Sequence, residues 1–113
     1  MNYEIVAIPN FRKELKKLSK KYASLKEDFS DLIQSLQETP IQGISLGKNC
    51  FKIRMSIKSK GKGKSGGARV ISLVKINKNT VFLLSVYDKA EKENISNTEL
   101  KALIELIEGE EQE

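Results

Sequence analysis

The chain has 113 residues and a formal net charge of +5, which fits one small basic domain, residues 1–113, with a single core. Its composition, 39% hydrophobic and 31% charged, excludes a disordered chain, and no run of 18 apolar residues or signal-peptide pattern occurs, so we expect a cytoplasmic protein without a membrane partner. The single cysteine, Cys50, and the absence of histidine exclude an internal disulfide and the usual zinc ligand sets, so we expect no metal and no cofactor.

The first predicted element is a strand over residues 3–7, where apolar and more polar side chains alternate before Pro9. Asn10 follows as a good N-cap for a helix. Apolar residues then recur at steps of three and four, which predicts an amphipathic helical region: Phe11, Leu15, Leu18, Tyr22, Leu25, Phe29, Leu32 and Leu36.

This helical region is expected to be a hairpin of two helices. Ser24 followed by Glu27 forms a capping-box pattern, which starts a second helix after a break near Ala23. Pro40 cannot continue a helix, so we expect the second helix to end there.

A strand with one buried face is predicted from residue 51. Four apolar residues, Phe51, Ile53, Met55 and Ile57, alternate with Lys52, Arg54, Ser56 and Lys58. Lys52 and Arg54 are therefore expected to stand side by side on the polar face. The segment SKGKGKSGG that follows is rich in glycine and in mutually repelling lysines, so it predicts a mobile basic hairpin loop.

Arg69 opens the next predicted strand, residues 68–76, on the same polar face of the sheet. This strand turns at residues 77–79 into a strand over residues 80–87. A capping box at Ser96 and Glu99 begins a final helix. The order strand, two helices, three strands and helix predicts an α+β fold with a three-stranded antiparallel sheet at its centre.

The two signs of charge separate along the chain. From Lys48 to Arg69 all the charged residues are basic, whereas those after Lys101 are all acidic. The lysines of the first helix fit a solvated face equally well. The second basic segment combines a strand with a loop, which is what binding to a polyanion requires.

Two segments, FKIRMSIKSKGKGKSGGARVISLV and VFLLSVYDKAEKENIS, resemble the RelE/ParE toxin superfamily, closest to its HigB-like branch. The resemblance covers nearly the whole chain. It implies a toxin of a type II toxin–antitoxin system that acts as a ribosome-dependent mRNA endonuclease, an mRNA interferase, and inhibits translation. The implied partners are a cognate antitoxin of the helix-turn-helix type, the ribosome and mRNA, with operator DNA bound only through the antitoxin.

Carried over by position, the resemblance puts the catalytic cations at Lys52, Arg54, Arg69 and Lys89. Metal-free RNA cleavage requires a base for the 2′-hydroxyl, an acid for the leaving oxygen and cations at the phosphate. We expect Arg69 to hold the phosphate with support from Arg54. Lys52 is the candidate base and Lys89 the candidate acid, in exchangeable roles, provided that crowding by like charges lowers their pKa from about 10.4.

Further side chains are expected to bind RNA or the ribosome. Lys58, Lys60, Lys62 and Lys64 are expected to contact the ribosomal RNA backbone. Tyr87 either stacks on the cut base or packs on the final helix, since the segment AEKENIS offers no aromatic residue or histidine where many relatives complete their site. Two other functions remain open: a ParE-like inhibitor of DNA gyrase, and an RNA- or DNA-binding module without catalysis.

Overall fold

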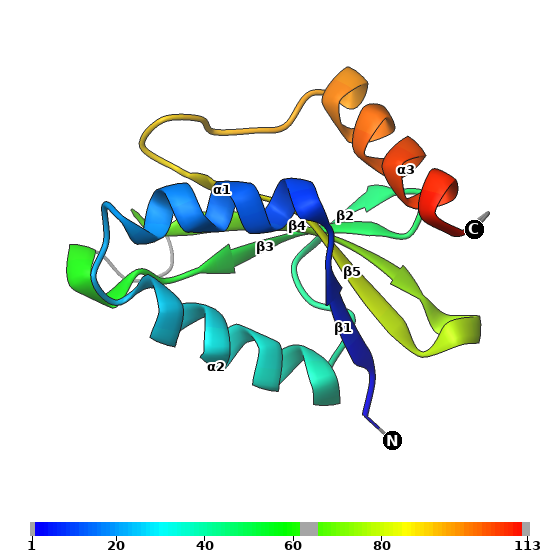
Figure 1. Cartoon of the computed structure of the whole chain (residues 1–113), viewed down its shortest axis with the longest axis horizontal. Coiled ribbons are helices and arrows are strands. Elements are labelled where there is room, and N and C mark those ends of the chain that lie inside the picture. Colours follow the sequence, from blue (N-terminus) through cyan, green and yellow to red (C-terminus); the bar gives the residue numbers. More distant parts are fainter. Residues whose placement is uncertain (1, 62–65, 112–113) are drawn as a thin grey trace.

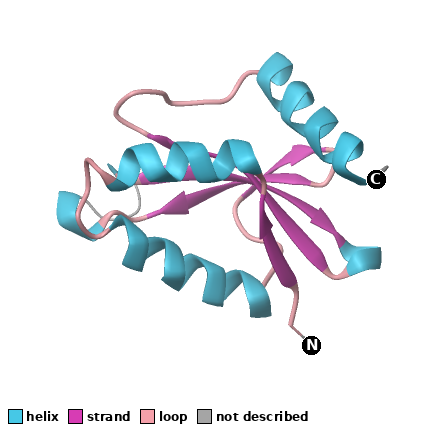
Figure 2. Cartoon of the chain, viewed as in Figure 1, coloured by secondary structure: helices cyan, strands magenta, loops and turns pink. Residues whose placement is uncertain are grey.

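The computed structural model describes residues 2–61 and 66–111. Its centre is a five-stranded sheet in the order β1-β5-β4-β3-β2, accompanied by three α-helices (Figures 1 and 2). The elements in chain order are β1 (Glu4–Ala7), α1 (Pro9–Ser19), α2 (Leu25–Glu38), β2 (Ile44–Gly47), β3 (Cys50–Met55), the 3-10 helix η1 (Lys58–Lys60), β4 (Ala68–Lys75), the 3-10 helix η3 (Ile76–Lys78), β5 (Thr80–Asp88) and α3 (Asn97–Glu111). The predicted α+β class is confirmed.

The sheet is wider than the three-stranded sheet predicted from the sequence. β1 joins it as a parallel neighbour of β5, whereas β2, β3, β4 and β5 pair in antiparallel fashion. β2 was not predicted. It has only four residues, and most of them are exposed, so it lacks the alternation of buried and exposed side chains that marks a strand.

Two of the predicted helix caps are wrong. Helix α1 begins at Pro9, whose fixed φ and missing N–H suit the first helical position. Asn10 therefore lies inside the helix, where its amide donates to the Leu84 carbonyl at 3.0 Å. Ser24 precedes α2 but does not cap it, because its Oγ donates to Asp28 Oδ2 at 2.7 Å.

Other predicted boundaries are confirmed. The helical region does break, between Ser19 and Leu25, and α2 ends at Glu38, two residues before Pro40. At the start of α3 the Glu99 N–H donates to Ser96 Oγ at 3.1 Å and the Ser96 N–H donates to Glu99 Oε1 at 3.2 Å, which is the reciprocal capping box.

The core lies between the helices and the sheet. The rings of Phe11 in α1 and Phe29 in α2 have centroids 5.3 Å apart, so these two helices share one apolar seam. The largest fully buried side chains come from both layers, namely Ile8, Phe11, Leu25, Leu36, Ile57, Ile71, Leu83, Leu84 and Ile107. Within the described part of the chain, no helix combines the length and the apolar character needed to cross a membrane.

Candidate functional site

Strand register brings separated cations into one row. Arg54 on β3 is the cross-strand partner of Arg69 on β4, and Arg69 is in turn the partner of Tyr87 on β5. Directly paired residues point to the same face of a sheet, and residues two apart on a strand share that face. Lys52 therefore stands beside Arg54 as predicted.

An open hollow of about 600 Å³ lies at this row. We call it the basic hollow; its lining residues are Gln42, Gly43, Ile44, Lys52, Ile53, Arg54, Arg69, Lys89, Glu93 and Asn94. All four predicted catalytic residues are among them. Of the described residues that line it, Glu93 is the one acidic side chain, so positive charge dominates the basic hollow and favours an anionic ligand.

The four cations differ in their surroundings. Lys52 is half-buried, and its Nζ donates to Asn94 Oδ1 at 2.8 Å, which links β3 to the segment after β5. Arg54 is exposed. Arg69 was expected on an exposed face, but it is only 4% exposed, and its Nη1 donates to the Ala68 carbonyl at 3.1 Å. This burial holds the guanidinium in one orientation.

Arg54 and Arg69 are directly paired on neighbouring strands, so the two residues belong to the same face of the sheet. A guanidinium presents forked donors that match the oxygens of a phosphate, so this pair of residues favours an anionic ligand.

Several residues of the basic hollow were missed by the sequence analysis: Gln42, Gly43, Ile44, Glu93 and Asn94. Gly43 was the one that a sequence signal could have found. It has φ +88°, and a Cβ there would lie 2.2 Å from the Lys52 carbonyl oxygen. Glycine is the residue that a positive φ and a close approach of two backbones favour, so the isolated glycine after the second helix was the available signal.

Tyr87 does not present its ring to the basic hollow. The residue is 7% exposed, and Lys92 Nζ lies 5.2 Å from the ring centroid. Burial raises the pKa of the phenol. Stacking on a base needs an open ring face, so the structure favours the packing role over the stacking role.

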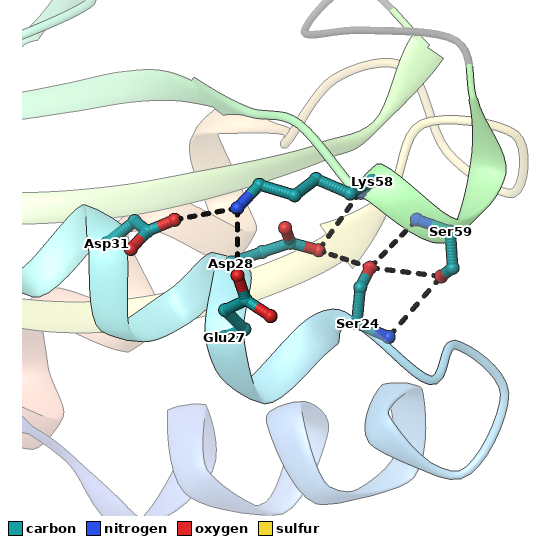
Figure 3. A network of polar contacts seen from close by, with 6 residues as sticks. All are labelled: Ser24, Glu27, Asp28, Asp31, Lys58 and Ser59. Carbon is teal, nitrogen blue, oxygen red and sulfur yellow. Dashed lines mark hydrogen bonds and ion pairs between the residues drawn. The ribbon is translucent and has the colours of Figure 1, made fainter.

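The lysines of the predicted loop have a different environment from the one expected. Lys58 and Lys60 belong to the ordered turn η1. Lys58 Nζ lies 3.1 Å from Asp31 Oδ2 and 3.2 Å from Glu27 Oε1 (Figure 3). The hydrogen bond to Asp31 has the largest effect on the pKa of Lys58 and raises it, and the hydrogen bond to Glu27 raises it further. The Lys60 side chain is only 11% exposed, so the prediction of a mobile, exposed loop is wrong for this lysine. Lys62 and Lys64 lie outside the described residues.

Turn η1 is docked on the N-terminus of α2. The Ser59 N–H donates to Ser24 Oγ at 2.8 Å, and the Lys58 N–H donates to the buried Asp28 Oδ2 at 3.2 Å (Figure 3). Ser24 Oγ, which also bonds to Asp28, connects the two contacts. Turn η1 is thus fixed to the start of α2.

Asp88, the last residue of β5, is a buried carboxylate with several hydrogen-bond donors. Its side chain is fully buried, with Lys60 Nζ 2.8 Å from Oδ1 and the Tyr22 hydroxyl donating to Oδ2. Burial by itself raises the pKa of Asp88, but the hydrogen bonds from Lys60, Tyr22 and the Ala90 N–H outweigh it and lower the pKa from 3.8 to about 2.

Stability is therefore expected to depend on pH through Asp88. A carboxyl whose folded pKa is depressed stabilises the fold above its unfolded pKa, and this contribution disappears as pH falls through the folded pKa. The shift corresponds to about 2 kcal/mol above pH 5, of which about half is lost by roughly pH 3. Urea unfolding of the wild type and Asp88→Asn should show a difference that shrinks over this window. A difference that stays constant from pH 5 to pH 3 would contradict the assignment.

Among the residues that the structure describes, no group of three or more Cys, Asp and Glu side chains is arranged to hold a metal ion. The basic hollow presents the guanidinium groups of Arg54 and Arg69 and the ammonium groups of Lys52 and Lys89. Side-chain cations of this kind are typical of sites that bind phosphate esters.

The comparisons with known proteins identify the family. A family model described as the RelE toxin of the RelE/RelB toxin–antitoxin system matches residues 10–109, so the chain belongs to the RelE toxin family. The HigB-like branch stays a prediction. A comparison with curated proteins finds no match.

Solved structures show the same fold. A mutant of the E. coli toxin RelE in the free state aligns with TM-score 0.60 and 24% identity, over 82% of this chain and 90% of that one. The toxin–antitoxin complex RelBE from E. coli gives TM-score 0.59 and 24% identity over 76% and 95% of the two chains. The complex RelBE2 from Mycobacterium tuberculosis gives 0.58 and 17% over 78% and 99%.

Proposed function

We propose that this RelE-family toxin is a ribosome-dependent endoribonuclease that cuts mRNA in the basic hollow without a metal ion. The observation that carries the proposal is the convergence of Lys52, Arg54, Arg69 and Lys89 on one hollow of about 600 Å³. These four cations come from two strands and from the segment after a third. A solvated basic face needs no such convergence, whereas stabilising a phosphorane-like transition state does.

In the proposed reaction the 2′-hydroxyl attacks the adjacent phosphorus, and the bond from phosphorus to the 5′ oxygen breaks. The products are a cyclic phosphate and a free 5′-hydroxyl. Lys52 and Lys89 form the acid–base pair: one takes the proton of the 2′-hydroxyl and the other supplies a proton to the leaving oxygen, with Lys52 the first candidate for the base. Arg69 and Arg54 carry the added charge on the phosphate oxygens, and because Arg69 is already held by its surroundings it needs little reorganisation.

The proposed partners follow from this activity and from the family. A cognate antitoxin of the helix-turn-helix type would neutralise the toxin and carry any operator DNA contact; the RelBE structures are complexes of a toxin with an antitoxin. The ribosome would position the message, since Tyr87 is buried and the site lacks an open aromatic platform for a base among the described residues. A ribosomal target places the action in the cytoplasm.

Cleavage is expected to depend on the ribosome. In a translating extract, mapping of mRNA 5′ ends should show cuts with a period of three nucleotides, because the ribosome presents one codon at a time. The same protein concentration should leave naked RNA intact. Efficient cutting of naked RNA would contradict ribosome dependence. Growth arrest with intact messages and inhibited gyrase would instead support the ParE-like function. Binding of RNA or DNA without any cleavage would support the non-catalytic binding module.

Charge in the loop is expected to contribute to ribosome binding. Replacing Lys62 and Lys64 by alanine should lower the slope of log affinity against log salt by roughly 0.7–0.9 for each phosphate that the variant no longer neutralises. Lys58→Ala is the matched control, because it removes one lysine that already has carboxylate partners within the chain. An equal change of slope per lysine in the control would mean that the ion pairs of Lys58 open on binding.

A further inference from the structure

The buried carboxylate of Asp88 lies next to the basic hollow without lining it. Asp88 is the last residue of β5, and the next residue is Lys89, which does line the basic hollow. Its side chain is 0% exposed, and burying a charge is costly unless every oxygen is satisfied. An apolar residue would fill this buried position without that cost, so we expect Asp88 to have a role that only a carboxylate can perform.

The first part of that role is local. Asp88 Oδ1 accepts the Ala90 N–H at 2.9 Å, a side-chain bond to the backbone two residues ahead that sets a turn. The Asp88 carbonyl accepts the N–H groups of Glu91 and Lys92 at 3.0 and 3.1 Å. Lys89 is therefore fixed between two anchored residues, and its own N–H donates to the Gly67 carbonyl at 3.2 Å.

The second part is long-range. Tyr22 reaches Asp88 from the connection between α1 and α2, and Lys60 reaches it from turn η1. The amine of Lys60 also lies 5.2 Å from the centroid of the Tyr22 ring, so the two donors support each other. One carboxylate thus joins three segments that are far apart in the sequence. The same carboxylate also holds the turn that carries Lys89, through its hydrogen bond with the Ala90 N–H.

We propose that Asp88 is a positioning residue, whose carboxylate, held by Tyr22 and Lys60, sets the place of Lys89 in the basic hollow. Lys60 acts through Asp88 and contacts no RNA in this arrangement. The inference rests on the proposed function only in that it takes the basic hollow as the place of cleavage.

The test compares Asp88→Asn with Asp31→Asn. Both replacements remove a carboxylate that pairs with a lysine of turn η1, but Asp31 pairs with Lys58 from helix α2, whereas Asp88 directly precedes Lys89. Single-turnover cleavage by toxin bound to ribosomes should fall tenfold or more in Asp88→Asn, because an error of about 1 Å in a reacting group can cost about 100-fold. The concentration for half-saturation should change less than twofold, and Asp31→Asn should match the wild type.

Lys60→Met separates positioning from RNA contact. If Lys60 acts through Asp88, the variant Lys60→Met/Asp88→Asn cuts no more slowly than Asp88→Asn alone, since the two residues belong to one pathway. If the two rate effects multiply, or if folded Asp88→Asn cuts at the wild-type rate, the proposal is overturned. Should Asp88→Asn fail to fold, Tyr22→Phe removes a single donor to the same carboxylate and must slow the single-turnover rate without changing half-saturation.

A readout that does not need activity keeps the two proposals distinguishable. Amide hydrogen exchange of the free protein should become faster at Ala90 and Lys92 in Asp88→Asn but not in Asp31→Asn. If the wild type does not cut messages on ribosomes, the proposed function fails, and the exchange data alone decide on positioning. Unchanged protection at Ala90 and Lys92 would overturn it.

Discussion

Arg69→Met is expected to abolish message cleavage and growth arrest while the protein stays folded. Arg69 faces Arg54 across the β3–β4 pair and is 4% exposed, so its guanidinium is held in place at the basic hollow, where we propose that phosphate charge develops. Loss of one such preorganised charge costs on the order of 100- to 1,000-fold in rate. Methionine keeps an unbranched apolar stem in the buried space. Growth arrest, single-turnover cleavage and thermal melting of the purified variant measure the effects separately.

Stability should change far less than activity in this variant. The hydrogen bond from Arg69 to the Ala68 carbonyl is removed, which by itself costs about 1 kcal/mol. Arg69→Lys should recover only part of the rate, because an ammonium cannot make the forked contact of a guanidinium. Arg12→Met, on the exposed face of α1, is the control and should remain toxic. A folded Arg69→Met protein that still cuts messages would remove Arg69 from the site.

The strand pattern predicted that Lys52, Arg54 and Arg69 lie together, because backbone geometry determines this grouping. Side chains of a strand alternate between two faces, so Lys52 and Arg54 had to share a face once β3 formed. The pairing of β3 with β4 then places Arg69 opposite Arg54. The identity of these cations as one group therefore follows from local periodicity plus a hairpin, which are the features that a sequence shows best.

What the sequence did not reveal depends on contacts between distant segments. Lys60 and Asp88 are 28 residues apart, and nothing local distinguishes the buried, paired Lys60 from the other lysines of the loop. The burial of Arg69 likewise depends on what packs around it and not on its position in a strand. β2 escaped prediction because Ile44, its first residue, is 56% exposed and so gives no core signal.

Gly43→Ala is expected to destabilise the protein and to distort the wall of the basic hollow, because it adds a methyl group where there is no space for one. The new Cβ would lie 2.2 Å from the Lys52 carbonyl oxygen and 3.1 Å from the Ile53 Cα, which are backbone atoms of β3 and cannot swing aside. The residue also has φ +88°, which costs an alanine about 1–2 kcal/mol. Overpacking against a rigid neighbour adds about 1–3 kcal/mol.

Gly47→Ala separates these two effects. Gly47 has nearly the same φ, +84°, but a Cβ there meets nothing within 4 Å, so only the conformational cost of about 1–2 kcal/mol applies. Free energies of unfolding in urea should therefore fall more for Gly43→Ala than for Gly47→Ala, and cleavage should disappear only in the first variant. Its backbone must move away from Lys52, the proposed base, whereas Gly47 lies at the far end of β2. Equal destabilisation of the two variants would mean that the backbone of β3 can move away from the added methyl group at little cost in free energy, which would contradict the prediction.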